Sequence, residues 1–166
     1  GAYLTYSVDT IEGLGTGNEF SAVFWYKLNA DPDRAGILVM GPPDEGNPDA
    51  PNNRTNGFRF FREAAEDDQR FKLNIGNGEA DNWFDGGEAA DIPASSNEWA
   101  HLAFSISASH AKVFINGEVV REGDFPGIDW TGCNILSIMS GEPRFTGWGH
   151  RSDLSMMDEL RIFNKA

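Results

Sequence analysis

The sequence contains only one cysteine, Cys133, so no intrachain disulfide can form. Small secreted eukaryotic domains usually depend on disulfides, so we expect either a reducing compartment or a bacterial domain that is stable without them. Long apolar runs are also lacking, since none approaches the roughly 20 residues of a membrane-spanning helix. No segment has the apolar period of an amphipathic helix. These absences argue against membrane-spanning and mainly helical proteins.

Positively charged residues are also scarce. The chain has 13 Lys and Arg against 26 Asp and Glu, which gives a formal net charge of −13. Such a surface repels phosphate backbones and anionic lipid, so nucleic acid and bare membrane are poor partners. A strongly anionic polysaccharide is disfavoured for the same reason, whereas neutral glycans and cations remain open. The alternative is that the charge only keeps the domain in solution.

Aromatic residues and turn residues are plentiful, with 12 Phe, 5 Trp, 3 Tyr and 19 Gly. This mixture favours short strands joined by turns. Asn116-Gly117 lies between two β-branched runs, as a type I′ hairpin requires. The run 20–28 is apolar on both faces, so we expect it to be covered on both sides, with Trp25 and Trp99 in the core. Strand-like runs occupy 2–8, 20–28, 36–41, 57–63, 70–76, 99–107, 112–123, 134–140 and 155–163.

These runs predict an all-β fold, a two-sheet antiparallel sandwich of the jelly-roll type. The length fits one domain over residues 1–166. Because the chain starts at Gly1 without a signal-peptide pattern and ends without a tail, we expect a domain excised from a longer protein. Three long polar stretches, 41–56, 76–98 and 140–153, are expected to be loops, which in compact domains are often functional.

Two of these loops carry tryptophans that we take as a candidate ligand site. Sugars present flat apolar faces edged with hydroxyls, so their sites need exposed aromatics beside hydrogen-bonding side chains. The alternative, equally weighted for Trp83 and Trp148, is that the rings fold back to plug the end of the sandwich. For Trp130 we favour that packing role. The predicted ligand-binding residues are Trp83 with Asn82 and Asp85, and Trp148 with Arg144, His150 and Arg151.

Four motifs occur in the order of a known family: "FSAVFWYKL", "EWAHLAFSIS", "AKVFINGEVV" and "MDELRIFNKA". Together they resemble the laminin G-like, concanavalin A-type jelly roll of bacterial surface and carbohydrate-active proteins, from about Leu4 to Ala166. The Pro-rich loop and "DWTGCNILSIMSGEPRF" resemble, more narrowly, the C-terminal domain of surface lipoproteins in glycan-utilisation systems of Bacteroides-type bacteria. The resemblance implies glycan binding on a concave sheet or its rim, an extracellular or outer-surface location, and a lipid-anchored parent protein.

The stretch "SMMDELRIF" (155–163) raises a separate question, because a strict two-residue period places Asp158 in an apolar row with Met156, Leu160 and Ile162. Burying an unpaired carboxylate costs several kcal/mol or more. Either hydrogen-bond donors compensate it or a hard cation such as calcium does. The resemblance favours structural calcium, because Asp158 matches a ligand position of calcium-holding relatives. The partners it suggests are Asp9 or Glu12 and the Gly41 carbonyl.

Catalysis is the less favoured interpretation. Hydrolytic relatives in the wider fold carry Glu-x-Asp-x-x-Glu on one strand, which places acid and nucleophile on one face. No predicted strand here has that spacing, and the three histidines are scattered. The sequence therefore predicts a non-catalytic carbohydrate-binding module for a neutral polysaccharide or oligosaccharide. The alternatives are a structural or protein-interaction spacer and, less favoured, a divergent glycoside hydrolase.

Overall fold

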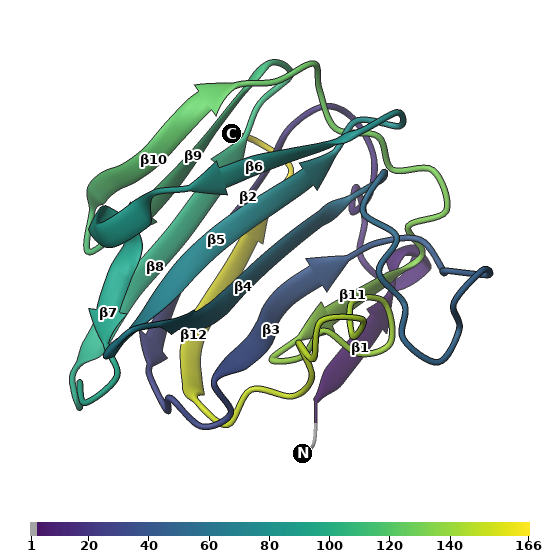
Figure 1. The fold of residues 1–166 in the computed structure, drawn as a ribbon. Helices are drawn as coiled ribbons and strands as arrows, with labels where there is room; N and C mark the ends of the chain where they lie inside the picture. The colour runs from purple at the N-terminus through teal and green to yellow at the C-terminus, as the bar shows by residue number, and fades with distance from the viewer. Residues whose placement is uncertain (1–2) are drawn as a thin grey trace.

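The computed structural model describes residues 3–166 and consists of two antiparallel sheets packed face to face (Figure 1). Two short 3₁₀ helices, η1 (Val8–Thr10) and η2 (Gly87–Ala90), accompany the strands. The strands are β1 (Leu4–Ser7), β2 (Phe20–Lys27), β3 (Arg34–Met40), β4 (Phe58–Ala65), β5 (Asp68–Gly76), β6 (Asp81–Asp85), β7 (Asp91–Pro93), β8 (Trp99–Ile106), β9 (His110–Ile115), β10 (Glu118–Asp124), β11 (Ile135–Ile138) and β12 (Met156–Phe163).

The two sheets divide the strands unequally. Sheet A has the order β1-β11-β3-β4-β5-β6, with β7 also paired to β5, and sheet B has the order β10-β9-β8-β2-β12. In Figure 1 strands β4, β5 and β6 lie in front of β2, β8 and β12. Neighbours in the sheets come from distant parts of the chain, as when β11 pairs with β1 and β3. The predicted jelly-roll sandwich of the concanavalin A type is confirmed.

The core lies between the sheets and is rich in phenylalanine. Strand β2 alternates strictly, so that Phe20, Phe24 and Tyr26 point inward and are almost fully buried. Phe60 from β4 and Phe104 from β8 stack across the sandwich at 5.1 Å between ring centroids. Each buried aromatic side chain contributes roughly 1.5–3 kcal/mol through its removal from water. The period of two in the sequence is thus what closes the two sheets on each other.

The hairpin predicted at Asn116-Gly117 joins β9 to β10. Asn116 and Gly117 have φ values of 53° and 85°, the left-handed pair that a type I′ turn requires and that asparagine and glycine adopt most readily. The prediction is therefore confirmed.

The stretch 76–98 is not a continuous loop as predicted. Strands β6 and β7 both lie along β5, with Trp83 opposite Asn74 and Ile92 opposite Gln69. The polar surroundings of "DNWFD" hid an alternation in which Phe84 points to the core while Trp83 points outward. Trp83 is consequently held by a strand and not by a loop.

The strict two-residue period assumed for β12 is also wrong. The pairing with β2 shifts between Asp158 and Arg161, and Glu159 has a φ of 51°, which marks a β-bulge. The extra residue changes the face on which the following side chains lie, so Leu160 and Ile162 are half-buried whereas Asp158 is exposed. Asp158 therefore does not lie in a buried apolar row, and its Oδ1 accepts a hydrogen bond from the Glu159 N–H at 2.8 Å.

Trp25 and Trp99 were expected in the core, and the structure corrects this. They are 40% and 42% exposed, because alternation places them with Lys27 on the outer face of sheet B, which no further layer covers. The apolar character of both faces of β2 had suggested two covering layers. Only the inner face is covered.

A charged cluster is buried at one end of the core. Arg62 and Asp153 are both fully buried at the side chain and lie 2.9 Å apart. Tyr26 donates its hydroxyl hydrogen to Asp153 at 2.5 Å and accepts one from Arg62 Nε at 3.0 Å. Arg62 also donates to the Pro32 and Asn29 carbonyls at 2.8 Å each. The cluster ties β4 to the segment that enters β12.

In residues 3–166 no helix is long and apolar enough to cross a membrane.

Candidate functional site

The outer face of sheet A presents polar and aromatic side chains in register. Arg59, Asn74 and Trp83 form one row across β4, β5 and β6, because Arg59 pairs with Asn74 and Asn74 with Trp83. In the next row Lys72 of β5 lies opposite Asp85 of β6. The alternation that sends Phe58, Phe60 and Phe84 to the core sends these residues to the other side. The alternation of the strands that builds the core therefore also produces the polar outer face of sheet A.

The 140–153 loop covers part of this face. Its Phe145 packs against Phe61 of β4 at 5.2 Å between centroids, and both rings are fully buried. The close approach depends on glycine: a Cβ at Gly36 of β3 would lie 2.2 Å from the Gly141 nitrogen, and one at Gly141 would lie 1.9 Å from the His150 oxygen. Backbone contact therefore sets where this loop lies on the sheet.

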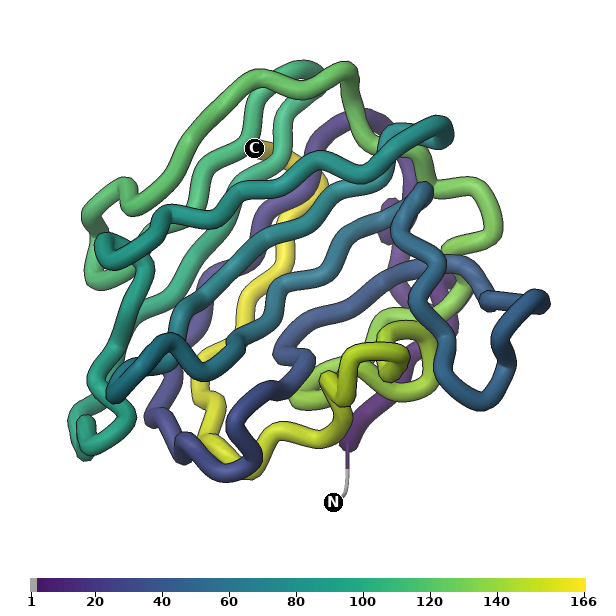
Figure 2. Tube along the Cα trace, in the orientation of Figure 1, coloured from purple at the N-terminus to yellow at the C-terminus, as the bar shows by residue number. Residues whose placement is uncertain are grey.

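The 41–56 loop lies beside it, and the two are joined by backbone hydrogen bonds. Thr146 and Gly147 N–H groups donate to the Pro51 carbonyl at 2.8 and 3.0 Å. Figure 2 shows both loops on the near side of the sheet, next to each other. From beneath, buried Arg59 donates to the Asn53 carbonyl at 2.5 Å; burial lowers the pKa of this arginine to about 10. Arg54 follows Asn53 in the chain, so this hydrogen bond also holds Arg54 over the sheet.

The two loops and β6 bring Trp83 and Trp148 together. Their ring centroids are 5.9 Å apart with a 21° interplanar angle, and each side chain is 39% exposed. Phe61 contacts Trp83 and Phe145 contacts Trp148, each edge to face at 6.0 Å. The nearly parallel indole pair is therefore supported from below by buried aromatic rings and remains half open to solvent.

Arg54 contacts the same pair. Its Cζ lies 4.3 Å from the Trp148 centroid and 6.0 Å from that of Trp83. Since the two rings are 5.9 Å apart, the guanidinium does not lie on the far side of Trp148 but contacts the pair from one side. A cation over an indole face is attracted by about 0.5–1 kcal/mol at an exposed site.

A polar frame surrounds the indoles. Arg54 Nε donates to Asp81 Oδ2 at 2.7 Å, and Asn74 Nδ2 donates to the same oxygen at 3.1 Å. The pKa of the Asp81 carboxyl is lowered: burial raises it, but the hydrogen bonds from Arg54 and Asn74 outweigh that. Asn74 is fully buried and its Oδ1 has no hydrogen-bond partner among the described residues. The frame thus offers charged, amide and aromatic groups within one small area.

The second row joins the ion pairs of Lys72 to a contact between Glu63 and His150. Lys72 Nζ lies 3.0 Å from Glu63 Oε2 and 3.1 Å from Asp85 Oδ2. His150 Nε2 lies 3.0 Å from Glu63 Oε1. The pKa of Glu63 falls to about 2, chiefly through the contact with His150 and then that with Lys72. Burial lowers the pKa of His150, so its imidazole is neutral near pH 7.

The exposed cations of this face have carboxylate partners, whereas the buried Arg59 donates to the Asn53 carbonyl. Arg54 pairs with Asp81, Lys72 with Glu63 and Asp85. At the end of the face Arg70 makes a two-pronged contact with Asp91 at 2.7 and 2.8 Å. The surface therefore has mixed but locally compensated charge.

The predicted site residues are partly brought together. Trp83, Trp148 and Asp85 lie on the same face of sheet A. Asn82 does not, because strand alternation turns it away from Trp83, and its Nδ2 donates to the Ile75 carbonyl at 3.1 Å. Asn82 is therefore not placed to contact a ligand that lies on Trp83.

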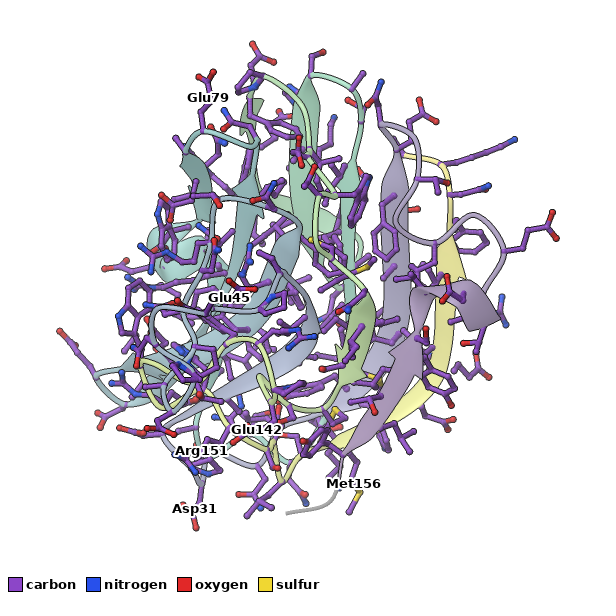
Figure 3. The ribbon with its side chains drawn as sticks, turned by 90° about the vertical axis from the view of Figure 1, so that its right-hand side faces the viewer. Asp31, Glu45, Glu79, Glu142, Arg151 and Met156 are labelled. Atoms are coloured by element: carbon purple, nitrogen blue, oxygen red, sulfur yellow. The ribbon has the colours of Figure 1, made fainter. Side chains whose placement is uncertain are left out.

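The other three predicted residues lie below or away from the indole pair. His150 is fully buried between Phe61 and Phe145, so it supports Glu63 and the loop without reaching the surface. Arg144 donates to Asn134 Oδ1 at 2.8 Å. Arg151 lies near Glu142 at the end of the sandwich that carries Asp31, as Figure 3 shows. Nearness in sequence to Trp148 did not predict nearness in space, because the loop turns sharply at its glycines.

The four residues predicted to bind structural calcium lie in surroundings that disfavour a cation. In residues 3–166 no group of three His, Cys, Asp or Glu side chains is placed to hold a metal. Asp9, Glu12 and Asp158 are exposed, and a Cβ at Gly41 would lie 2.4 Å from the Arg59 guanidinium, a cation that disfavours a second one. The exposed carboxylates and the neighbouring arginine disfavour this ligand set, and calcium binding stays a prediction.

Sequence reasoning missed Arg54, Asn74 and Asp81. Asn74 and Asp81 could have been found from the alternation of β5 and from a strand at 81–85. Nothing in the order of residues places Arg54 over Trp148, because these two residues are 94 positions apart in the sequence.

A search of known families matches residues 2–166 to a model of the concanavalin A-like lectin/glucanases superfamily. No curated protein sequence matches significantly. Domain 4 of a GH43 extracellular arabinanase from Geobacillus stearothermophilus, solved with arabinotriose, is similar at 25% identity and a TM-score of 0.60, covering 93% of this chain and 64% of that one.

Two further structures share the fold. The CBM40 of an IT-sialidase from Ruminococcus gnavus, bound to α2,3-sialyllactose, has a TM-score of 0.64 at 16% identity and covers 99% of this chain and 87% of that one. A protein of Bacteroides ovatus proposed to bind carbohydrate has a TM-score of 0.61 at 15% identity, covering 99% and 41%. The chain thus spans less than two thirds of the arabinanase and Bacteroides ovatus structures. By the family match over nearly its whole length, the chain belongs to the concanavalin A-like lectin/glucanases superfamily.

Proposed function

We propose that the domain is a non-catalytic carbohydrate-binding module that holds a neutral glycan against Trp83 and Trp148. The observation that carries this proposal is the half-exposed indole pair, 5.9 Å between centroids, beside the hydrogen-bonding frame of Arg54, Asn74 and Asp81. Flat apolar rings fit the C–H faces of sugars, and the frame supplies partners for their hydroxyls. Arg54 and Asp81, each 26% exposed at the side chain, can bond sugar hydroxyls, while the buried Asn74 holds Asp81 in place.

Compensated charge supports a neutral ligand. A carboxylated sugar gains most from a free arginine or lysine. Here Arg54, Arg70 and Lys72 are already paired with protein carboxylates, so an anionic ligand would have to displace one of them. The net charge of −13 adds long-range repulsion. Among the ligands of similar domains, arabinotriose fits this chemistry better than sialyllactose.

The state of the carboxylates supports a binding role without catalysis. Glycoside hydrolysis needs one carboxyl group that stays protonated to act as an acid. On this face the pKa values of Glu63, Asp81 and Asp85 are all lowered. Such groups are ionised near neutral pH and occupied by cations. The similarity to an extracellular arabinanase domain and to a sialidase CBM40 supports an extracellular bacterial glycan-utilisation protein as the parent.

A glycan array followed by calorimetry tests the proposal. The array carries neutral arabino-, xylo-, gluco- and manno-oligosaccharides beside sialylated and uronic-acid glycans. We expect binding to a neutral class, weakened roughly tenfold or more by Trp83→Ala and by Trp148→Ala. Phe163→Ala is the matched control, since Phe163 is an exposed aromatic of β12 (46%) outside this face. Binding to no glycan would favour a spacer or protein-interaction role, and equal binding by all variants would place the glycan site away from Trp83 and Trp148.

A further inference from the structure

A second aromatic surface lies on the opposite side of the molecule. Trp25 of β2 and His101 of β8 are direct cross-strand partners, with ring centroids 5.1 Å apart at 68°. Trp99 precedes His101 by two residues and points to the same face, where it lies opposite Lys27. The three rings therefore lie on the same face of two adjacent strands, the outer face of sheet B. We call them the Trp25–Trp99 surface.

Trp25 and Trp99 are exposed to water at positions that neither a sheet edge nor the packing of the core explains. Strands β2 and β8 are the inner strands of sheet B, between β9 and β12, so the rings do not protect a free sheet edge. The core is closed without them, because Phe24 and Leu102 fill the inner face at these strands with no exposure. Exposed aromatics gathered on the central strands of a sheet are typical of a recognition surface.

The polar groups around the rings are balanced in charge. Lys27 has no carboxylate within ion-pair distance in residues 3–166, and Asp158 lies opposite Trp25 with its Oδ1 engaged only by the Glu159 N–H. The surface therefore carries one cation, one anion and an imidazole in a chain of net charge −13. Met156, 61% exposed, lies opposite Lys27 and projects from the end of the sandwich in Figure 3.

This composition argues for one kind of occupant. A second copy of the chain would bring another net charge of −13 against the first, with Lys27 beside the rings to offset it. An uncharged chain of hydroxylated rings meets no such repulsion, and it can stack on the indoles while Lys27, His101 and Asp158 bond its hydroxyls. The exposure of Trp25 and Trp99, 40% and 42%, is close to the 39% of Trp83 and Trp148.

We infer that the Trp25–Trp99 surface is a second, independent contact for a neutral polysaccharide, so that one domain holds two chains on opposite faces. It shares the class of ligand with the first site but depends on different residues. Because the two faces point away from each other, a single short oligosaccharide cannot occupy both. The domain would then join polysaccharide chains as well as bind them.

Affinity gel electrophoresis tests the inference. The native protein is run through gels that contain arabinan, xylan, β-glucan or mannan. The variants are Trp25→Ala/Trp99→Ala, Trp83→Ala/Trp148→Ala and the fourfold combination, with Leu154→Ala as the exposed apolar control and a thermal melt to confirm folding. We expect a retaining polysaccharide for which each double variant binds roughly tenfold or more weakly, the fourfold variant is not retained, and only the wild type and the control crosslink the polysaccharide into a precipitate.

Several outcomes overturn the inference. One is retention and precipitation of Trp25→Ala/Trp99→Ala equal to wild type; if Trp83→Ala/Trp148→Ala loses retention in the same gels, the proposed function survives alone. Conversely, loss with Trp25→Ala/Trp99→Ala only would support this surface and contradict the site on sheet A. A change of oligomeric state in Trp25→Ala/Trp99→Ala, seen by size-exclusion chromatography with light scattering, identifies a protein interface instead. Retention of the wild type by no polysaccharide overturns both proposals.

Discussion

Two arginine–carboxylate pairs of similar length have opposite surroundings. Arg62 and Asp153 are 2.9 Å apart and wholly buried, whereas Arg54 and Asp81 are 2.7 Å apart and both 26% exposed. The buried pair is enclosed by Tyr26 and backbone carbonyls, which fix both partners. The exposed pair borders the indoles and solvent. Similar distances therefore do not mean similar energies. Removing Asp153 would leave the Arg62 charge without a partner in the core, whereas removing Asp81 would leave the Arg54 charge in contact with water.

The largest effect is expected when the buried pair loses its anion. Asp153→Ala leaves the Arg62 guanidinium charged in the core and should lower the free energy of unfolding by about 3–5 kcal/mol. Urea unfolding followed by fluorescence measures it. Asp81→Ala is the matched control and should cost less than about 1 kcal/mol. If the two variants lose similar stability, the contrast between the pairs is wrong.

Replacing the buried pair as a whole sharpens this contrast. A double variant Arg62→Met/Asp153→Leu removes both charges, so it should be much more stable than Asp153→Ala, because well-packed apolar residues often substitute for a buried ion pair at little cost. The same unfolding experiment applies. A double variant as unstable as Asp153→Ala would show that the hydrogen bonds to Tyr26, and not the stranded charge, dominate.

The Glu63–His150 contact is intermediate, with His150 buried and the Glu63 side chain 21% exposed. His150 has a lowered pKa when folded, so below its unfolded value of about 6.5 the unfolded chain binds more protons and stability falls. Glu63 adds a second loss as pH falls from about 4.5 to about 2. Unfolding measured between pH 8 and 3 should show both. In Glu63→Gln the second loss should shrink; an unchanged profile would contradict the assignment.

The exposed pair should matter more for the geometry of the site than for stability. Arg54→Ala should change the free energy of unfolding by less than about 1 kcal/mol but alter the exciton-coupled circular dichroism of the Trp83–Trp148 pair. Arg54→Lys keeps the charge for Asp81 and loses the planar guanidinium beside the indoles. A spectrum altered by Arg54→Ala and restored by Arg54→Lys would show that charge alone positions the indoles, without a contribution from the shape of the guanidinium.

The smallest effect is expected at Asp158. The side chain is exposed beside a bulge, so Asp158→Ala should change stability by less than about 0.5 kcal/mol. Thermal melts with and without a chelator measure it. A chelator that lowers the melting temperature of the wild type but not that of Asp158→Ala would restore the calcium site that the sequence suggested.

Much of the fold could be predicted from local pattern. Asn116-Gly117 fixed one hairpin because only residues tolerant of positive φ suit that turn. Strand periodicity identified β2 and β8 nearly to the residue. It failed at Asp158, where one extra residue in a bulge reverses the facing of the next side chains in the strand, and at Trp25, since periodicity separates two faces without saying which layers cover them.

The candidate site was predictable only in part. Trp83 and Trp148 stood out by residue type. Their meeting depends on where a loop lies on a sheet, which depends in turn on contacts such as Gly36 with Gly141 that leave no periodic trace. Arg54 reaches Trp148 for the same reason. Long-range placement of loops is the information that a single sequence carries least visibly.

The glycine contact between β3 and the 140–153 loop has a practical meaning. Because backbone meets backbone there, the loop is docked by shape and not by the identity of the side chains it displays. Trp148 should then be exchangeable, whereas Gly141 should not, since a methyl group 1.9 Å from the His150 oxygen would lift the whole loop. Ligand preference could therefore be re-engineered at the tip of the loop while Gly36 of β3 and Gly141 of the loop keep it in place.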